Sequence, residues 1–95
     1  MMLVKKSAPF TRGELVKQLD AAKIGNRMLF GGNLVRQPAF VSLRKQQPGA
    51  FRVAGDLAGA DRIMNEAVFI GTYPGLTPAM IAYMVDTIRR FAKKF

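Results

Sequence analysis

The chain has 95 residues, which is enough for one domain and too few for a second. Apolar residues make up 49% of it, as in a folded protein rather than a disordered tail. It contains no Cys and no His, which excludes disulfides, thiolate metal sites, iron–sulfur ligation and every catalytic triad that needs His. We therefore expect no metal site and no catalytic residue within this chain.

The formal net charge of +9 brings nucleic acid into consideration as a partner. The basic residues are scattered, however, and their one local cluster is Arg89, Arg90, Lys93 and Lys94. That cluster falls at the end of a predicted helix, where cations complement the helix dipole. No nucleic-acid-binding motif accompanies it, so nucleic acid is an unfavoured partner.

The N-terminal residues Met1–Lys6 lack the long apolar stretch of a signal peptide. No apolar run elsewhere reaches the length that spans a bilayer. The composition therefore predicts a cytoplasmic domain without a membrane partner.

Residues 1–30 have the pattern of a helix between two strands. Thr11 and Glu14 have the spacing of a capping box, which predicts a helix over Arg12–Ala22. Gly25 follows this helix and suits a positive φ at its exit. The flanking strands are expected at Leu3–Lys6 and Arg27–Phe30.

A polar segment with paired glycines follows from Gly31 to Pro38. Glycines let the backbone approach another group closely. Asn33, Arg36 and Gln37 bring three polar side chains into this short space. From Ser42 to Phe51 the chain is polar and contains Pro and Gly, which predicts mainly loop.

Residues 56–76 predict a helix, a strand and a turn. The helix is expected at about Ala60–Ala67, with Ile63 and Met64 facing inward. A compact apolar strand follows at Val68–Ile70, and Tyr73–Gly75 ends it with turn residues.

The last helix is expected to begin with Thr77 as N-cap and Pro78 at the first helical position. Asp86 and Arg90 lie four residues apart and can form an ion pair. The Met and Phe side chains of the helices are most simply core residues. The apolar face of this helix comprises Ile81, Met84, Val85, Ile88, Phe91 and Phe95.

The order of expected elements is strand, helix, strand, loop, helix, strand, helix. It predicts an α+β fold with a small, mostly antiparallel sheet and helices packed on one side.

Four fragments of the chain also occur, in the same order, in a known family. The chain resembles the C-terminal end of the sugar aminotransferase and dehydratase family (DegT/DnrJ/EryC/StrS), which has the aspartate-aminotransferase-like fold. Within it, the resemblance is greatest to the CDP-6-deoxy-hexulose 3-dehydrases, which serve 3,6-dideoxysugar synthesis for lipopolysaccharide. The most specific piece is Leu-Phe-Gly-Gly-Asn-Leu-Val-Arg-Gln-Pro. The fragments are Lys6–Arg12, Leu29–Pro38, Asp61–Met64 and Tyr73–Thr77.

The resemblance implies that residues 1–95 are the small C-terminal domain of a larger fold type I, pyridoxal phosphate-dependent enzyme. In that branch a large upstream domain holds pyridoxamine phosphate, a His replaces the usual Schiff-base Lys, and cysteines bind a two-iron cluster. This chain has no His or Cys, so we expect it to bind neither group and to catalyse nothing alone. Its expected partners are the large cofactor domain and a nucleotide-sugar substrate, and a homodimer is a further candidate assembly.

The resemblance also places Phe30–Gln37 where the small domain helps to cover the nucleotide sugar. Arg36 offers a planar charged fork for a diphosphate or a pair of hydroxyls, and Asn33 can donate and accept hydrogen bonds. A structural alternative stays open, in which Arg36 pairs with a carboxylate, Asn33 caps a turn and Arg62 is solvated. The candidate substrate-binding residues are Asn33, Arg36, Gln37, Phe30, Gly32 and Arg62.

Three functions remain open. The leading one is the substrate-covering small domain of a nucleotide-sugar 3-dehydrase in dideoxysugar synthesis. The second is the same domain of a nucleotide-sugar aminotransferase, because amino transfer and dehydration share this fold. The third is a free-standing basic adaptor for nucleic acid or protein, which would bind oligonucleotides in a salt-dependent way.

Overall fold

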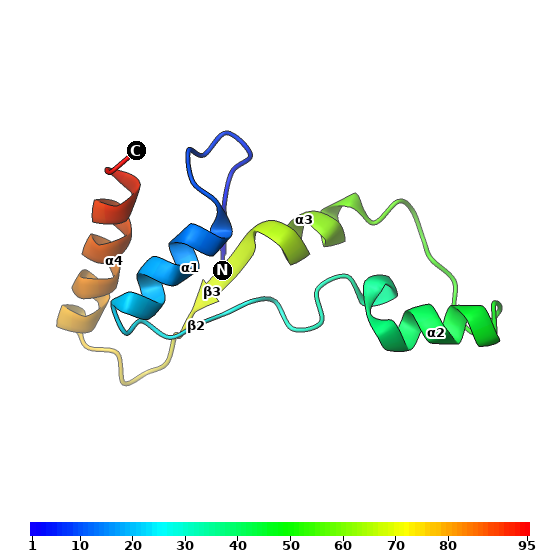
Figure 1. Ribbon diagram of the computed structural model, residues 1–95. Coiled ribbons are helices and arrows are strands. Elements are labelled where there is room, and N and C mark those ends of the chain that lie inside the picture. The colour runs from blue at the N-terminus through cyan, green and yellow to red at the C-terminus, as the bar shows by residue number, and fades with distance from the viewer.

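A computed structural model describes residues 1–95 (Figure 1). Its elements in chain order are β1 (Met2–Leu3), α1 (Arg12–Ala21), β2 (Asn26–Arg27), the short 3-10 turn η1 (Leu34–Arg36), α2 (Pro38–Gln46), α3 (Ala58–Glu66), β3 (Ala67–Ile70) and α4 (Pro78–Ala92).

The three strands form one antiparallel sheet in the order β1-β3-β2. Met2 lies opposite Val68, and Arg27 lies opposite Phe69. The central strand β3 is the most apolar, and its Ala67 and Val68 are fully buried. The predicted α+β fold with a small antiparallel sheet is thereby confirmed.

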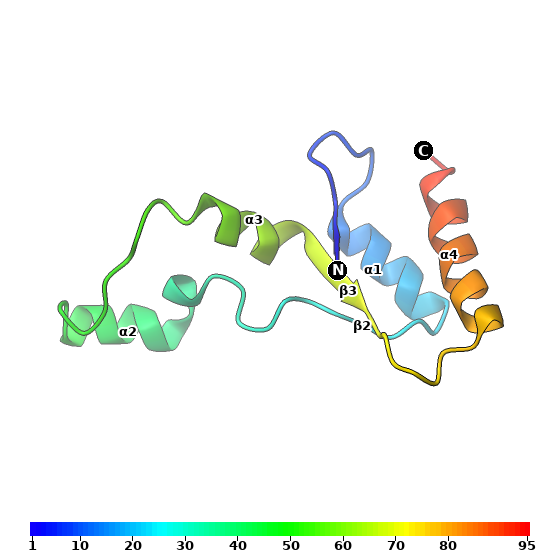
Figure 2. The same ribbon diagram turned by 180° about the vertical axis from the view of Figure 1, so that it is seen from behind.

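The hydrophobic core lies at one end of the molecule, where α1 contacts both the sheet and α4 (Figures 1 and 2). Leu15 and Leu19 of α1 enter it four residues apart, on one face of the helix. The core comprises Leu15, Leu19, Ile24, Val68 and Phe91. We call β1, α1, β2, β3 and α4 the core lobe.

Residues 28–57, which include η1 and α2, leave the core lobe as a projection that we call the arm (Figure 2). The radius of gyration of the chain is 17.1 Å, whereas a compact domain of this length would have about 12 Å. The arm returns to the core lobe through α3, which runs directly into β3.

Both predicted helix starts in the core lobe are confirmed. The Thr11 hydroxyl accepts a hydrogen bond from the Glu14 amide at 3.3 Å, and the Glu14 carboxylate accepts one from the Thr11 amide at 2.7 Å. The Thr77 hydroxyl accepts one from the Met80 amide at 3.2 Å, with Pro78 at the first helical position.

The expectation of a loop over residues 42–51 is wrong in its first half, because α2 extends to Gln46. Gln37 is extended and Pro38 opens the helix, a position where the missing amide hydrogen has no cost. The Pro and Gly residues that suggested a loop lie after the end of this helix.

The exit of α1 also differs from its prediction, because the positive φ of 58° falls on Lys23 instead of Gly25. The Lys23 amide donates to the Asp20 carbonyl, and the Ile24 amide donates to the Leu19 carbonyl at 2.9 Å. These two hydrogen bonds form a Schellman motif, in which Ile24 packs back on Leu19.

Three further expectations are corrected. The strands are shorter than expected: β1 ends at Leu3, and β2 ends at Arg27. Ile81 and Val85 of α4 are exposed, as is Phe95 beyond the end of that helix, while Thr87 and Phe91 of α4 are buried. Arg90 donates to the backbone carbonyl of Asp86 at 3.4 Å and makes no ion pair with its carboxylate.

Candidate functional site

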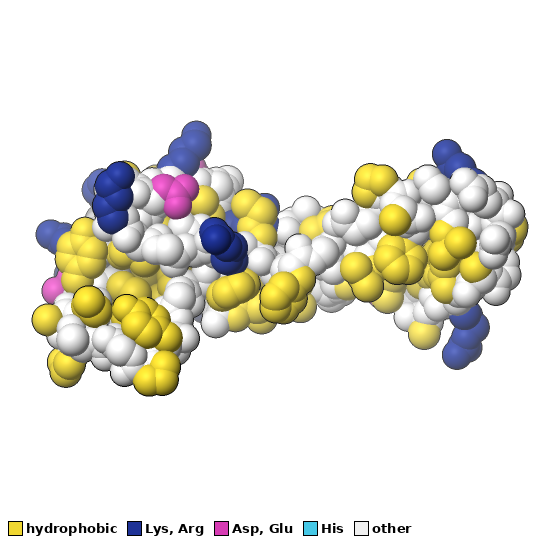
Figure 3. Space-filling view, turned by 90° about the horizontal axis from the view of Figure 1, so that it is seen from below, with side chains coloured by type: hydrophobic (Ala, Val, Ile, Leu, Met, Phe, Trp, Pro, Cys, Tyr) yellow, Lys and Arg dark blue, Asp and Glu magenta, His cyan; other side chains and the backbone are white.

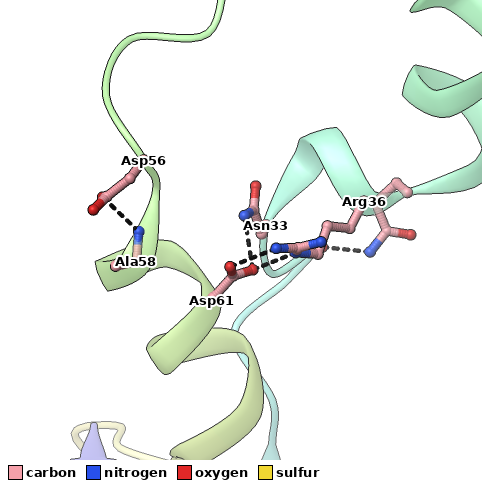
Figure 4. Close-up of polar contacts among 7 residues, drawn as sticks. Asn33, Arg36, Asp56, Ala58 and Asp61 are labelled. Carbon is pink, nitrogen blue, oxygen red and sulfur yellow. Dashed lines mark hydrogen bonds and ion pairs between the residues drawn. The ribbon is translucent and has the colours of Figure 1, made fainter.

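Asn33 and Arg36, two of the predicted site residues, converge on Asp61 at the base of the arm (Figure 4). The Asn33 amide donates to Oδ1 of Asp61 at 3.0 Å. The Arg36 guanidinium donates through Nε to Oδ1 and through Nη2 to Oδ2 at 2.7 Å. Such a forked pair fixes orientation as well as distance. We call Asn33, Arg36 and Asp61 the polar clamp.

Local structure brings the members of the clamp together. Asn33 precedes η1 and Arg36 ends it, so one tight turn presents both side chains on the same side. Asp61 lies in the first turn of α3, where a carboxylate also complements the helix dipole. Asn33 is buried although it is polar, which is acceptable because its amide is hydrogen-bonded.

The clamp alters the titration of its charged groups. Hydrogen bonds from Arg36 and then Asn33 lower the pKa of Asp61 from 3.8 to about 2. The hydrogen bond to Asp61 raises the pKa of Arg36. Asp61 is therefore ionised throughout the neutral range, and the pair is an ion pair there.

Arg36 keeps some of its hydrogen-bond donors free. Its side chain is 58% exposed, and Nη1 makes no hydrogen bond within the protein. The guanidinium thus presents one edge to Asp61 and leaves donors facing solvent, where an anionic oxygen could accept them.

Gly32 and Gln37 stand on either side of the clamp. Gly32 has a φ of 63°, and an added Cβ would lie 2.5 Å from Cγ of Met64. Only glycine therefore fits where the arm crosses α3. The Gln37 side-chain amide donates to the Gly31 carbonyl and closes the segment on itself.

Two predicted site residues lie outside the clamp. Phe30 is 91% exposed, with a φ of 31°, and its ring centroid is 6.3 Å from that of Phe69. Arg62 points to Glu66 on its own helix, with Nε and Oε2 3.0 Å apart. The structure thus brings Asn33 and Arg36 together with Gly32 and Gln37 beside them.

Sequence reasoning missed Asp61 as a site residue, although Asp61 begins the family-like fragment Asp61–Met64. The signal available was an acidic residue in the first turn of a predicted helix, and no spacing rule connects it to residue 36. Arg12 was also missed as a structural residue: its guanidinium donates to the carbonyls of Met64 and Ala67 and joins α1 to the end of α3.

An apolar hollow of about 530 Å³ lies away from the clamp, between the start of α4 and the exit of α1. It is lined chiefly by Ile24, Tyr73, Leu76, Met80, Tyr83 and Met84.

No helix of the protein has the length and apolar character needed to cross a membrane.

Comparisons with known proteins give a consistent result. The chain is 47% identical over 88 residues to the lipopolysaccharide biosynthesis protein RfbH of Salmonella typhimurium, covering 93% of the chain and 19% of that relative. It is 40% identical over 91 residues to the dTDP-4-dehydro-2,6-dideoxy-D-glucose 3-dehydratase of Saccharopolyspora spinosa, covering 96% of the chain and 18% of that relative.

The chain therefore spans about a fifth of the length of these curated relatives. The sequence profile of the DegT/DnrJ/EryC1/StrS aminotransferase family matches residues 1–89. This match extends over both the core lobe and the arm. The chain belongs to the DegT/DnrJ/EryC1/StrS aminotransferase family.

Proposed function

We propose that the chain is the substrate-covering small domain of a nucleotide-sugar 3-dehydratase that acts in dideoxysugar synthesis. The observation that carries this proposal is the polar clamp, which orients Arg36 through two hydrogen bonds yet leaves guanidinium donors exposed at the base of the arm. The printed names of both relatives, a lipopolysaccharide biosynthesis protein and a sugar 3-dehydratase, support it.

Under this proposal Arg36 binds the diphosphate of the nucleotide sugar through its free edge. A guanidinium fixed by a carboxylate loses little conformational freedom when it binds, because its orientation is already set. Phe30 would add an exposed aromatic face beside the ligand, and Gln37 would fix the backbone around Gly31. Asn33 holds Asp61 through its side-chain amide, and its direct recognition of a sugar hydroxyl stays a prediction.

The cofactors implied by the family find no suitable groups in this chain. Pyridoxamine or pyridoxal phosphate needs a histidine or a buried lysine, and an iron–sulfur cluster needs cysteine ligands. The chain has no His or Cys. All seven lysines are exposed. The chemistry belongs, on this proposal, to a large cofactor domain outside the chain.

An aminotransferase is the second candidate, because the matching family profile is described by that activity. The two candidates use the same substrate class and differ at the cofactor. The clamp is compatible with either, and the printed 3-dehydratase name of one relative favours dehydration.

The test is a titration of the isotope-labelled chain with cytidine diphosphate glucose, followed by nuclear magnetic resonance. Amide shifts are expected at residues 31–37 and at Arg36 Nε, with weaker shifts for inorganic pyrophosphate. Arg36→Ala should abolish the response, while Arg62→Ala should preserve it. Shifts confined to Arg89–Lys94, or reproduced by any oligonucleotide, would contradict the proposal and favour a basic adaptor.

A further inference from the structure

Helix α2 lies in the arm and is weakly supported by packing. It has nine residues, and none of them is buried. Its N-cap residue Gln37 makes no side-chain capping bond. One apolar contact of the helix is the edge-to-face packing of Phe40 on Phe51, with ring centroids 5.7 Å apart. Helices of this length are marginal in water unless another surface packs against them.

The surface area of the chain also indicates a missing partner. The protein exposes 7097 Å², whereas a compact protein of its mass would expose about 5,400 Å². The excess of about 1,700 Å² is roughly twice the 800 Å² that one partner contributes to a stable interface. The elongated arm accounts for this excess, because it adds surface while Asn33 is its only buried residue.

The chemistry of the α2 segment, residues 38–55, defines what could cover it. The segment contains Arg44, Lys45 and Arg52 and no acidic residue, and none of the three is ion-paired. Val41 is exposed on α2, and Leu34 is exposed just before it. Apolar side chains cover much of the face of the arm seen in Figure 3, with cations at its edges.

We infer that α2 is a docking element that packs into an apolar groove, rimmed by carboxylates, on a protein surface outside residues 1–95. A second copy of this chain does not fit, because each copy has a net charge of +9 and only six acidic residues. The exposed Leu34 and Val41 require an apolar surface, which fits a protein better than a nucleic acid. The inference rests on the proposed function, because the partner is then the cofactor-binding part of a family-length protein.

The experiment compares hydrogen exchange in two settings. One is the free chain, and the other is the Salmonella typhimurium relative in which this chain replaces the segment that it matches. Amides of residues 39–46 should exchange nearly unprotected in the free chain and at least about tenfold more slowly in the chimera, without substrate. If the chimera does not fold, the aligned segment of the native relative supplies the second measurement.

Charge reversal tests the chemistry of the partner. Arg44→Glu with Lys45→Glu should return the exchange of α2 in the chimera to the rate of the free chain. Arg89→Glu with Lys93→Glu changes the net charge equally at the far end of α4 and should leave α2 protected. Equal exchange of α2 in chimera and free chain would overturn the inference, as would protection in the free chain that rises with its concentration or on adding duplex DNA.

Failure of the inference can be told apart from failure of the proposed function. In one outcome, cytidine diphosphate glucose shifts the signals of residues 31–37 while α2 stays unprotected in the chimera. This outcome would contradict only the docking role of α2. Protection of α2 in the substrate-free chimera together with no response to the nucleotide sugar would leave docking intact and reject the ligand.

Discussion

The core lobe and the arm hold their shapes by different means. In the core lobe, side chains from α1, β3 and α4 exclude water together, and Leu19 and Val68 are completely buried. In the arm only Asn33 is buried, and its position depends on one carboxylate. Stability in the first region depends on apolar volume, and order in the second depends on a few hydrogen bonds.

This difference explains where the candidate site lies. A packed core tolerates little movement, since its side chains interdigitate at nearly crystalline density. The base of the arm is ordered by polar groups that remain accessible, so a ligand can exploit them. The candidate site thus lies on a segment that hydrogen bonds, rather than a packed core, keep in place.

The largest effect on stability is expected when a leucine is replaced by alanine in the core lobe, compared with the same replacement in the arm. Leu19→Ala should destabilise the protein by about 3 kcal/mol, because it leaves a cavity at a fully buried position. Leu34→Ala, at a side chain that is 54% exposed, should change stability by less than about 0.5 kcal/mol. Urea unfolding followed by circular dichroism measures both. Similar losses for the two variants would show that the arm is packed as tightly as the core lobe.

The next largest effect on stability is expected from a substitution that strains the backbone of the arm and leaves the core lobe unchanged. Gly32→Ala should cost about 1–2 kcal/mol locally, because its φ of 63° is unfavourable for alanine and the new Cβ meets Met64. Faster hydrogen exchange should be confined to residues 28–37 and α3. Gly49→Ala has a normal φ and open space, so it serves as the matched control. A loss of protection in α1 would mean that arm and core lobe unfold as one unit.

Helix capping gives a smaller effect in the core lobe alone. Thr77→Ala removes the hydroxyl that accepts from the Met80 amide and should cost about 1 kcal/mol. Thr77→Ser retains the hydroxyl and should stay close to the wild type. The melting temperature of each variant measures the difference. Gln37, at the start of α2, makes no such bond, so Gln37→Ala should not change global stability to the same extent.

Local signals in the sequence were sufficient for most of the core lobe. Thr11 with Glu14, and Thr77 with Pro78, predict two helix starts, because capping involves residues only three positions apart. The apolar strand β3 was equally clear from its composition. The strand boundaries of β1 and β2 were not, because each is two residues long and is set by its pairing with β3.

The site could be predicted only in part, since its members are far apart in the chain. Asn33 and Arg36 were identified from the glycine-rich segment and from the family resemblance. Their common partner Asp61 lies 25 residues beyond Arg36, and no local pattern joins them. The structural alternative for Arg36, pairing with a carboxylate, is present in the structure, while its role toward a ligand remains a prediction.

The smallest effect is a selective response of the arm to acid. Folding lowers the pKa of Asp61 from 3.8 to about 2, so the folded state favours the carboxylate. The contribution of the clamp is therefore complete above about pH 4 and is lost as the pH falls through about 2. The side-chain amide signals of Asn33 and the Nε signal of Arg36 should report this loss in a pH titration followed by nuclear magnetic resonance.

Glu14 provides the comparison within the core lobe, because hydrogen bonds from Thr11 also lower its pKa. Its titration should move the Thr11 and Glu14 amides while leaving Asn33 unchanged. Asp61→Asn removes the ionisable group from the arm, so the acid response of Asn33 and Arg36 should disappear and that of Thr11 should persist. If Asn33 still responded in this variant, its acid sensitivity would have to come from unfolding of the core lobe, and the clamp could not be what orders the arm.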